Sequence, residues 1–96
     1  MLSEDEVSAA LRGLPGWQAA EVGGKPGISK TFRCGNFLSG LGFVTRVAVL
    51  AERAGHHPDV ILTYPSVGVS LTTHDAGGLT DKDFALAREI EAIGPR

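Results

Sequence analysis

The sequence is poor in the features that mark several large classes of protein. It has one cysteine, Cys34, among 96 residues, so no disulfide can form within the chain and a reducing compartment is expected. No apolar run approaches the ~20 residues of a membrane-spanning helix. Residues 1–6, MLSEDE, are acidic, whereas a secretory signal begins with a basic segment followed by an apolar one. We therefore expect a cytoplasmic protein that has no contact with a membrane.

A cluster of basic residues is also absent. The formal net charge is −2, which argues against direct binding to DNA or RNA, because proteins that bind nucleic acids concentrate positive charge against the phosphates. The hydrophobic content of 43% and the charged content of 21% are ordinary for a globular protein. The length predicts a single domain, residues 1–96. Its core would be modest, so self-association is a natural source of further apolar burial.

Capping residues predict where three helices begin. Ser3 precedes Glu6, and Thr80 precedes Asp83, with the capping-box spacing in which two side chains satisfy free backbone N–H groups. Asn36 is a favourable N-cap for the helix between them. We expect this middle helix to bury a broad surface against a sheet, because apolar residues recur along it in two adjacent stripes. The stripes are Phe37, Leu41, Val44, Ala48 and Ala51, and beside them Phe43, Val47 and Leu50.

Alternating apolar residues predict four strands between the helices. The expected strands span residues 17–22, 28–34, 58–64 and 67–74. Lys30 interrupts the apolar side of the second strand, which predicts a position at an edge or rim of the sheet. The order αββαββα predicts an α+β fold in which three helices pack on one face of a four-stranded antiparallel sheet.

The three histidines of the chain, His56, His57 and His74, fall within about twenty residues. If Pro65-Ser66 is a two-residue hairpin loop, His57 faces His74 across two strands, with Cβ atoms ~5 Å apart. A slip of one residue would still leave them close. Because an imidazole both donates and accepts protons near neutral pH, three converging histidines favour a chemical site.

Four interpretations of the histidines stay open at this point. They could be solvated residues at strand ends. They could bind zinc, although His56 and His57 point in different directions on an extended chain, and the sequence has no HExxH motif and no cysteine pair. They could activate a nucleophile, but Cys34 lies in an apolar alternation and no GxSxG motif is present. They could move protons on a neutral, ring-shaped substrate without forming a covalent intermediate.

Residues that flank the histidines have a structural and a chemical interpretation. Glu52 is either a solvated charge at a helix end or a carboxylate that orients a nearby imidazole. Asp83 is the acid of a capping box, and it could also serve the site if its helix points towards His74. Pro58 is expected to set the entry to the third strand.

The stretch from residue 52 to residue 83 resembles the pterin-4a-carbinolamine dehydratase family. The pattern consists of Glu52, the tandem His56-His57-Pro58, Tyr64, His74 and Asp83. Most of the remaining chain agrees with it at Leu14-Pro15-Gly16-Trp17, Phe32, Phe37, the helix Phe43 to Glu52, and Gly78-Leu79-Thr80. Cys34, where that family has an aromatic residue, is an apparent departure and lies outside the expected site.

The resemblance implies an αββαββα fold that assembles into homodimers or homotetramers. It implies dehydration of a 4a-hydroxytetrahydropterin to the quinonoid dihydropterin, in recycling of the pterin cofactor of aromatic amino acid hydroxylases, with no metal or other cofactor. It also implies that His56 and His74 form the acid–base pair and that His57 positions the pterin. The supporting residues that it implies are Glu52, Pro58 and Asp83.

The same family contains members that bind proteins. One is a dimerisation cofactor of a homeodomain transcription factor, and others are proposed to act in the assembly of carbon-fixation enzymes. A non-catalytic role in protein binding or transcription is therefore the alternative function. The presence of all three histidines favours the enzyme.

Overall fold

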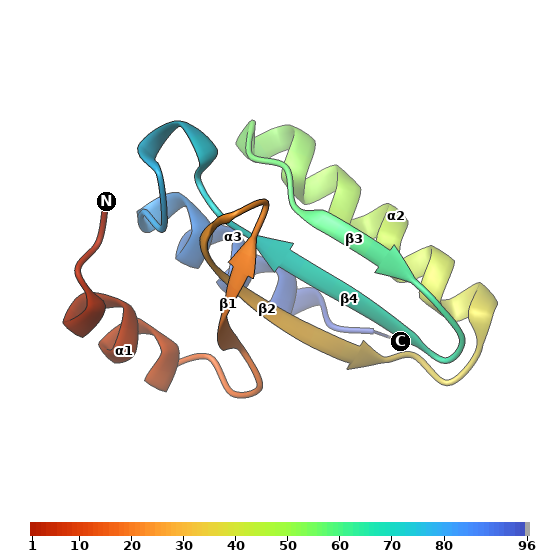
Figure 1. Cartoon of the computed structure of the whole chain (residues 1–96). Helices are drawn as coiled ribbons and strands as arrows, with labels where there is room; N and C mark the ends of the chain where they lie inside the picture. Colours follow the sequence, from red (N-terminus) through yellow and green to blue (C-terminus); the bar gives the residue numbers. More distant parts are fainter. Residues whose placement is uncertain (96) are drawn as a thin grey trace.

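A computed structural model describes residues 1–95, so Arg96, the last residue of the predicted domain, lies outside the described part. The chain folds in the order αββαββα, with one short 3-10 helix before the last α-helix (Figure 1). This confirms the predicted order and the α+β class. The elements are α1 (Glu4–Arg12), β1 (Gln18–Val22), β2 (Lys25–Arg33), α2 (Phe37–Ala54), β3 (Asp59–Leu62), β4 (Ser66–Leu71), η1 (His74–Ala76) and α3 (Asp81–Ile93).

The four strands form one antiparallel sheet in the order β1-β2-β4-β3. Helices α2 and α3 cover one face of this sheet, and α1 lies at its β1 end (Figure 1). The register of β1 with β2 runs from Val22↔Lys25 to Gln18↔Ser29, so Lys30 lies just beyond the end of β1, in agreement with the predicted rim position. Its Nζ donates to the carbonyl oxygen of Pro15 at 2.9 Å and pairs with Glu91 of α3.

The core lies between the sheet and helices α2 and α3. Alternation along β4 turns Val67, Val69 and Leu71 towards the helices, and all three are fully buried. On β2 the same alternation buries Phe32, whose ring packs against that of Phe43 on α2 with 4.8 Å between the centroids. In residues 1–95, no helix is both long enough and apolar enough to cross a membrane.

Helix α2 buries one of its two predicted apolar stripes completely and the other only in part. The stripe of Phe43, Val47 and Leu50 is buried. In the other stripe Ala51 is buried and Val44 packs against the core, but the prediction is wrong for Phe37 and Leu41, which are 52% and 47% exposed. The reason is the position of α2 over β3 and β4 at the edge of the sheet (Figure 1). The side of α2 that carries Phe37 and Leu41 has nothing to pack against there among the described residues.

The hairpin between β3 and β4 turns one residue earlier than predicted. Thr63 and Ser66 exchange two backbone hydrogen bonds, of 2.9 and 3.0 Å, so the loop is the cis-linked pair Tyr64-Pro65. The register is therefore Leu62↔Val67, two residues away from the predicted pairing. The predicted pairing of His57 with His74 is wrong, because β4 ends at Leu71 and residue 74 begins η1.

The tip of the β1–β2 hairpin is held against the end of β4. A Cβ atom at Gly27 would lie 2.6 Å from the carbonyl oxygen of Leu71, and it would overlap the side chain of Val22. Val22 is buried, and its side chain packs against the backbone of Gly27. The hydroxyl of Thr72 donates to the carbonyl oxygen of Pro26 at 2.7 Å and joins the same two segments.

We predict that Gly27→Ala lowers the free energy of unfolding by about 1–3 kcal/mol, because the new methyl group displaces backbone. Gly68→Ala is the matched control in β4, since its Cβ would meet only Ile61, at 3.9 Å, and its change should stay within about 0.5 kcal/mol. Urea unfolding followed by circular dichroism measures both variants. Equal stability of the two variants would contradict the close packing at Gly27.

Candidate active site

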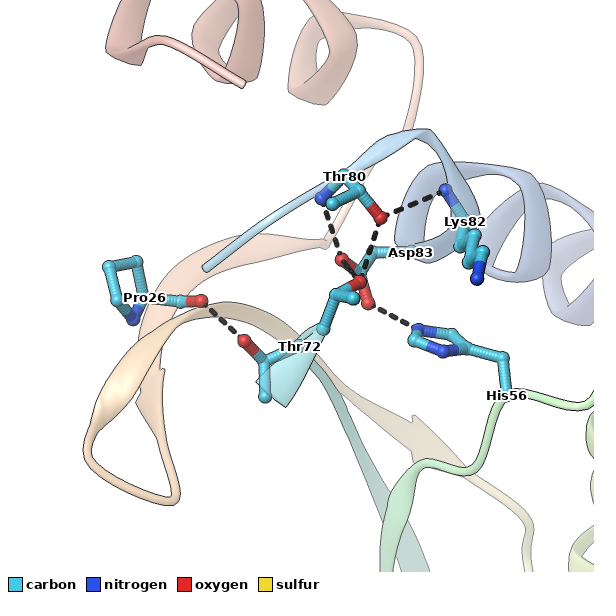
Figure 2. A network of polar contacts seen from close by, with 7 residues as sticks. Pro26, His56, Thr72, Thr80, Lys82 and Asp83 are labelled. Atoms are coloured by element: carbon cyan, nitrogen blue, oxygen red, sulfur yellow. Dashed lines mark hydrogen bonds and ion pairs between the residues drawn. The ribbon is translucent and has the colours of Figure 1, made fainter. Parts of the chain in front are cut away.

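A buried carboxylate–histidine pair joins the end of α2 to the start of α3. His56 directly follows Gly55, the left-handed C-cap of α2, and Asp83 lies in the first turn of α3. Nε2 of His56 is 2.6 Å from Oδ1 of Asp83 (Figure 2). Asp83 is fully buried, and the side chain of His56 is 11% exposed. The imidazole therefore has little freedom to turn.

The second oxygen of Asp83 accepts two further hydrogen bonds. Oδ2 receives the backbone N–H of Thr80 at 2.9 Å and the hydroxyl of Thr73 at 2.8 Å. The first of these belongs to the capping box predicted from the sequence, which is confirmed. Asp83 thus caps a helix and holds a histidine at once. The histidine that it holds is His56, a partner that the sequence analysis did not name.

An exposed carboxylate–histidine pair lies beside the buried one. Oε1 of Glu52, in the last turn of α2, is 2.6 Å from Nε2 of His57. The side chains of Glu52 and His57 are 79% and 64% exposed. Water screens such a pair and competes for both partners. His57 is therefore oriented more loosely than His56, although the two distances are equal.

His74 reaches the same region from the other side. It begins η1, directly after Thr73, and its side chain is exposed. Two adjoining depressions, of about 200 and 260 Å³, share His57, Thr72 and His74 in their walls, and we call them together the histidine cleft. His56 lines the second depression. The structure thus brings the three histidines to one cleft, by a route that differs from the predicted strand pairing.

Several residues of the histidine cleft were not among the predicted site residues. The first depression is also lined by Val22, Gly23, Asp59 and Ser70, and the second by Gly55, Thr73, Asp75 and Lys82. The sequence held a signal for Ser70 and Thr72, since these polar residues alternate with apolar ones along the predicted strand 67–74. It held none for Val22 and Gly23, which arrive from the tip of a distant hairpin. Pro58 is half-buried between His57 and β3.

The imidazoles that line the cleft suit proton transfer. Two of its imidazoles have one ring nitrogen engaged by a carboxylate and the other left for exchange with a ligand. Within residues 1–95, no three His, Cys, Asp or Glu side chains are grouped as the ligands of a metal ion would be.

We predict that the two carboxylates differ strongly in their effect on stability. Asp83→Asn should lower the free energy of unfolding by about 3 kcal/mol, because it breaks a buried ion pair. It also places an amide NH2 group opposite groups that donate hydrogen bonds to the carboxylate in the wild type. Glu52→Gln is the matched control on the exposed pair and should cost less than about 1 kcal/mol. Thermal and urea unfolding of both variants checks this. Similar losses for the two would show that burial does not distinguish the pairs.

Known proteins agree with this fold along nearly the whole chain. Residues 1–93 match the family model described as pterin 4 alpha carbinolamine dehydratase. A Chloroflexus aggregans protein, provisionally named pterin-4-alpha-carbinolamine dehydratase, is 51% identical over 92 residues, which are 96% of this chain and 95% of that protein. A Rhizobium etli protein with the same provisional name is 45% identical over 95 residues, 99% of this chain and 92% of its own.

Solved structures show the same architecture. The crystal structure of a transcriptional coactivator/pterin dehydratase from Brucella melitensis has a TM-score of 0.87 and 39% identity, and 97% of each chain is covered. A pterin dehydratase-like protein identified as a RuBisCO assembly factor in the alpha-carboxysome has a TM-score of 0.66 over 80% of this chain and 87% of its own. At 23% identity, this second likeness shows the fold alone. The family match and the relatives confirm the resemblance noted in the sequence, and the chain belongs to the pterin 4 alpha carbinolamine dehydratase family.

Proposed function

We propose that this chain is a 4a-hydroxytetrahydrobiopterin dehydratase, a hydro-lyase that works by histidine acid–base catalysis. Its substrate is a 4a-hydroxytetrahydropterin, and its products are the quinonoid dihydropterin and water. The gathering of His56, His57 and His74 at the histidine cleft is the observation that carries this assignment. Family membership supports the substrate class.

The reaction needs two proton transfers, which two imidazoles can perform. The bond between C4a and its hydroxyl oxygen breaks, and a protonated imidazole supplies the proton with which the hydroxyl leaves as water. The N5–H proton passes to a neutral imidazole as the N5=C4a double bond forms. We assign these roles to His56 and His74 as a pair, and the positioning of the ring to His57. No metal or organic cofactor takes part in either step.

The polar groups of the cleft support binding of a pterin ring. A pterin carries an amino group, an oxo group and ring N–H groups at the edge of its pyrimidine ring. Asp59, Ser70 and Thr72 line the first depression beside His57, and their carboxylate and hydroxyl groups can accept and donate hydrogen bonds to such an edge. Glu52 and Asp83 act through the imidazoles that they contact. Pro58 acts by setting the direction in which the backbone leaves His57 and enters β3.

The proposed place of the reaction is the recycling of the tetrahydropterin cofactor of aromatic amino acid hydroxylases. The single cysteine, Cys34, is free and buried, as expected of a protein from the reducing cytoplasm. A role in protein binding is the alternative, and two solved relatives are described as a coactivator and as an assembly factor.

Self-association through α2 belongs to this proposal. Leu38 and Val49 are 77% and 58% exposed, and together with Phe37 and Leu41 they make up what we call the outer flank of α2. An exposed apolar surface of this kind is typical of an interface. We propose that it joins copies of the chain into a homodimer or homotetramer.

We predict that the wild-type protein accelerates the loss of a chemically generated 4a-carbinolamine in a stopped-flow assay. His56→Ala and His74→Ala should each lower kcat about 100-fold or more, because each removes one partner of the proton transfer. Arg88→Ala removes an exposed side chain of α3 that does not line the cleft, and it should leave the rate unchanged. No acceleration by the wild-type protein over buffer would exclude the enzyme and leave the binding role.

We predict that the double variant Leu38→Glu/Leu41→Glu has a lower molar mass in solution than the wild type, since it places charges on the outer flank of α2. Arg88→Glu on α3, at an exposed residue that is already polar, is the control and should keep the wild-type mass. Gel filtration with light scattering measures all three. A monomeric wild type, or a double variant that retains the oligomer, would overturn this assignment of the interface.

A further inference from the structure

Two threonine hydroxyls lie behind the buried carboxylate–histidine pair. Oγ1 of Thr73 is 2.8 Å from Oδ2 of Asp83 and 2.7 Å from Oγ1 of Thr80. Figure 2 shows this network, with the imidazole of His56 on one side of the carboxylate and Thr80 on the other. Among the described residues, neither hydroxyl has a hydrogen bond to Glu52 or His57. The role of these hydroxyls in the chemistry of the site is therefore exerted through Asp83.

The direction of each hydrogen bond in the network follows from the number of protons available. An ionised carboxylate only accepts, so Thr73 donates its single hydroxyl proton to Asp83. The hydroxyl of Thr80 must then donate to Thr73, while it accepts the backbone N–H of Lys82 at 3.3 Å. The chain of donors runs from Thr80 through Thr73 to the carboxylate.

This order fixes the tautomer of His56. Oδ2 of Asp83 is occupied by the Thr73 hydroxyl and by the Thr80 amide, and Oδ1 is left to accept from Nε2 of His56. Nε2 therefore carries a proton when the ring is neutral as well as when it is charged. The nitrogen that gains and loses a proton is Nδ1.

Thr73 also anchors the turn that carries the second proposed acid–base residue. Its backbone N–H donates to the carbonyl oxygen of Gly78 at 3.1 Å, and the amide of Gly78 returns a bond to its carbonyl oxygen at 3.4 Å. His74 is the next residue and starts η1. One residue thus restrains both the carboxylate behind His56 and the backbone beneath His74.

We propose that Thr73 is a positioning residue: its hydroxyl holds the carboxylate of Asp83 in the orientation in which Oδ1 accepts from Nε2 of His56. This keeps His56 in the Nε2–H tautomer, with Nδ1 as the atom that exchanges the proton. The catalytic consequence rests on the proposed dehydratase function, whereas the tautomer does not. Loss of the hydroxyl leaves Oδ2 with the Thr80 amide alone of its two donors. The carboxylate is then held less firmly, and His56 is no longer restricted to one tautomer and one orientation.

The ring nitrogens of His56 can be observed directly by ¹⁵N NMR, at a pH where the imidazole is neutral. The wild-type protein should show the Nε2–H tautomer at His56. Thr73→Val, which keeps the shape and removes the hydroxyl, should show a mixture of tautomers. Thr73→Ser should restore the wild-type pattern. Thr45→Val is the matched control, because it removes an exposed hydroxyl that bonds only within α2, to the carbonyl oxygen of Leu41.

Kinetics in the carbinolamine assay supply a second, independent measurement. Thr73→Val should lower kcat about tenfold and change KM by less than about twofold, because the missing hydroxyl is engaged by Asp83 and Thr80 and gives its one proton to Asp83. Thr73→Ser should recover most of the rate, and Thr45→Val should match the wild type. Circular dichroism at the assay temperature gives the folded fraction of each variant, by which kcat is corrected, so that a loss of folded enzyme is not counted as a loss of kcat.

The inference is overturned by a wild-type His56 in the Nδ1–H tautomer, a measurement that needs no variant to fold. It is also overturned if Thr73→Val is folded and keeps both the wild-type tautomer and the wild-type kcat. A wild-type protein with the Nε2–H tautomer but no dehydratase activity would instead refute the proposed function and leave the tautomer assignment standing.

Discussion

The buried carboxylate of Asp83 is the point on which the site depends. A charged group with no access to water is costly unless hydrogen-bond donors surround it, and this one has donors from three separate segments: His56 after α2, Thr73 after β4, and the amide of Thr80 before α3. The buried carboxylate is therefore stabilised only when these three segments meet. The histidine cleft forms at their meeting point.

The three histidines differ in how deeply they and their partners are buried. His56 is pinned by a desolvated partner, whereas His57 shares an equally short contact with a carboxylate that water surrounds. His74 stands on a single 3-10 turn at the end of β4. This arrangement suits a reaction with two proton transfers, because one group is fixed in direction while the others can follow the ring as its geometry changes. The opposite wall, at Val22 and Gly23, is kept in place by the close contact at Gly27.

The sequence predicted well what depends on neighbours along the chain. Both capping boxes and the Asn36 cap are present, because the donor and acceptor lie three residues apart and need no tertiary contact. The β3–β4 register was wrong because the sequence has no signal that separates a Tyr64-Pro65 loop from a Pro65-Ser66 loop. A change of one residue in the loop moved the pairing by two residues and took His74 out of the strand.

The predictions that were wrong and the contacts that were missed depend on parts of the chain that are distant in sequence. Periodicity showed that α2 has a broad apolar surface, but how much of it is covered depends on where the helix crosses the sheet. The contact between Asp83 and His56 joins residues that are 27 positions apart, so their spacing along the chain gave no sign of it. The family pattern nevertheless marked both residues, because a shared pattern reflects the folded site.

The most direct test of the central claim is a crystal structure of the chain with a stable dihydropterin bound. The pterin ring should lie in the histidine cleft, with Nδ1 of His56 and the imidazole of His74 facing its N5–C4a side at hydrogen-bond distance, roughly 3 Å. The apolar groove between α1 and β1, a cavity of about 510 Å³ lined by Val7, Leu11 and Ala19, offers a competing site. A pterin bound there, with the histidine cleft empty, would contradict the account.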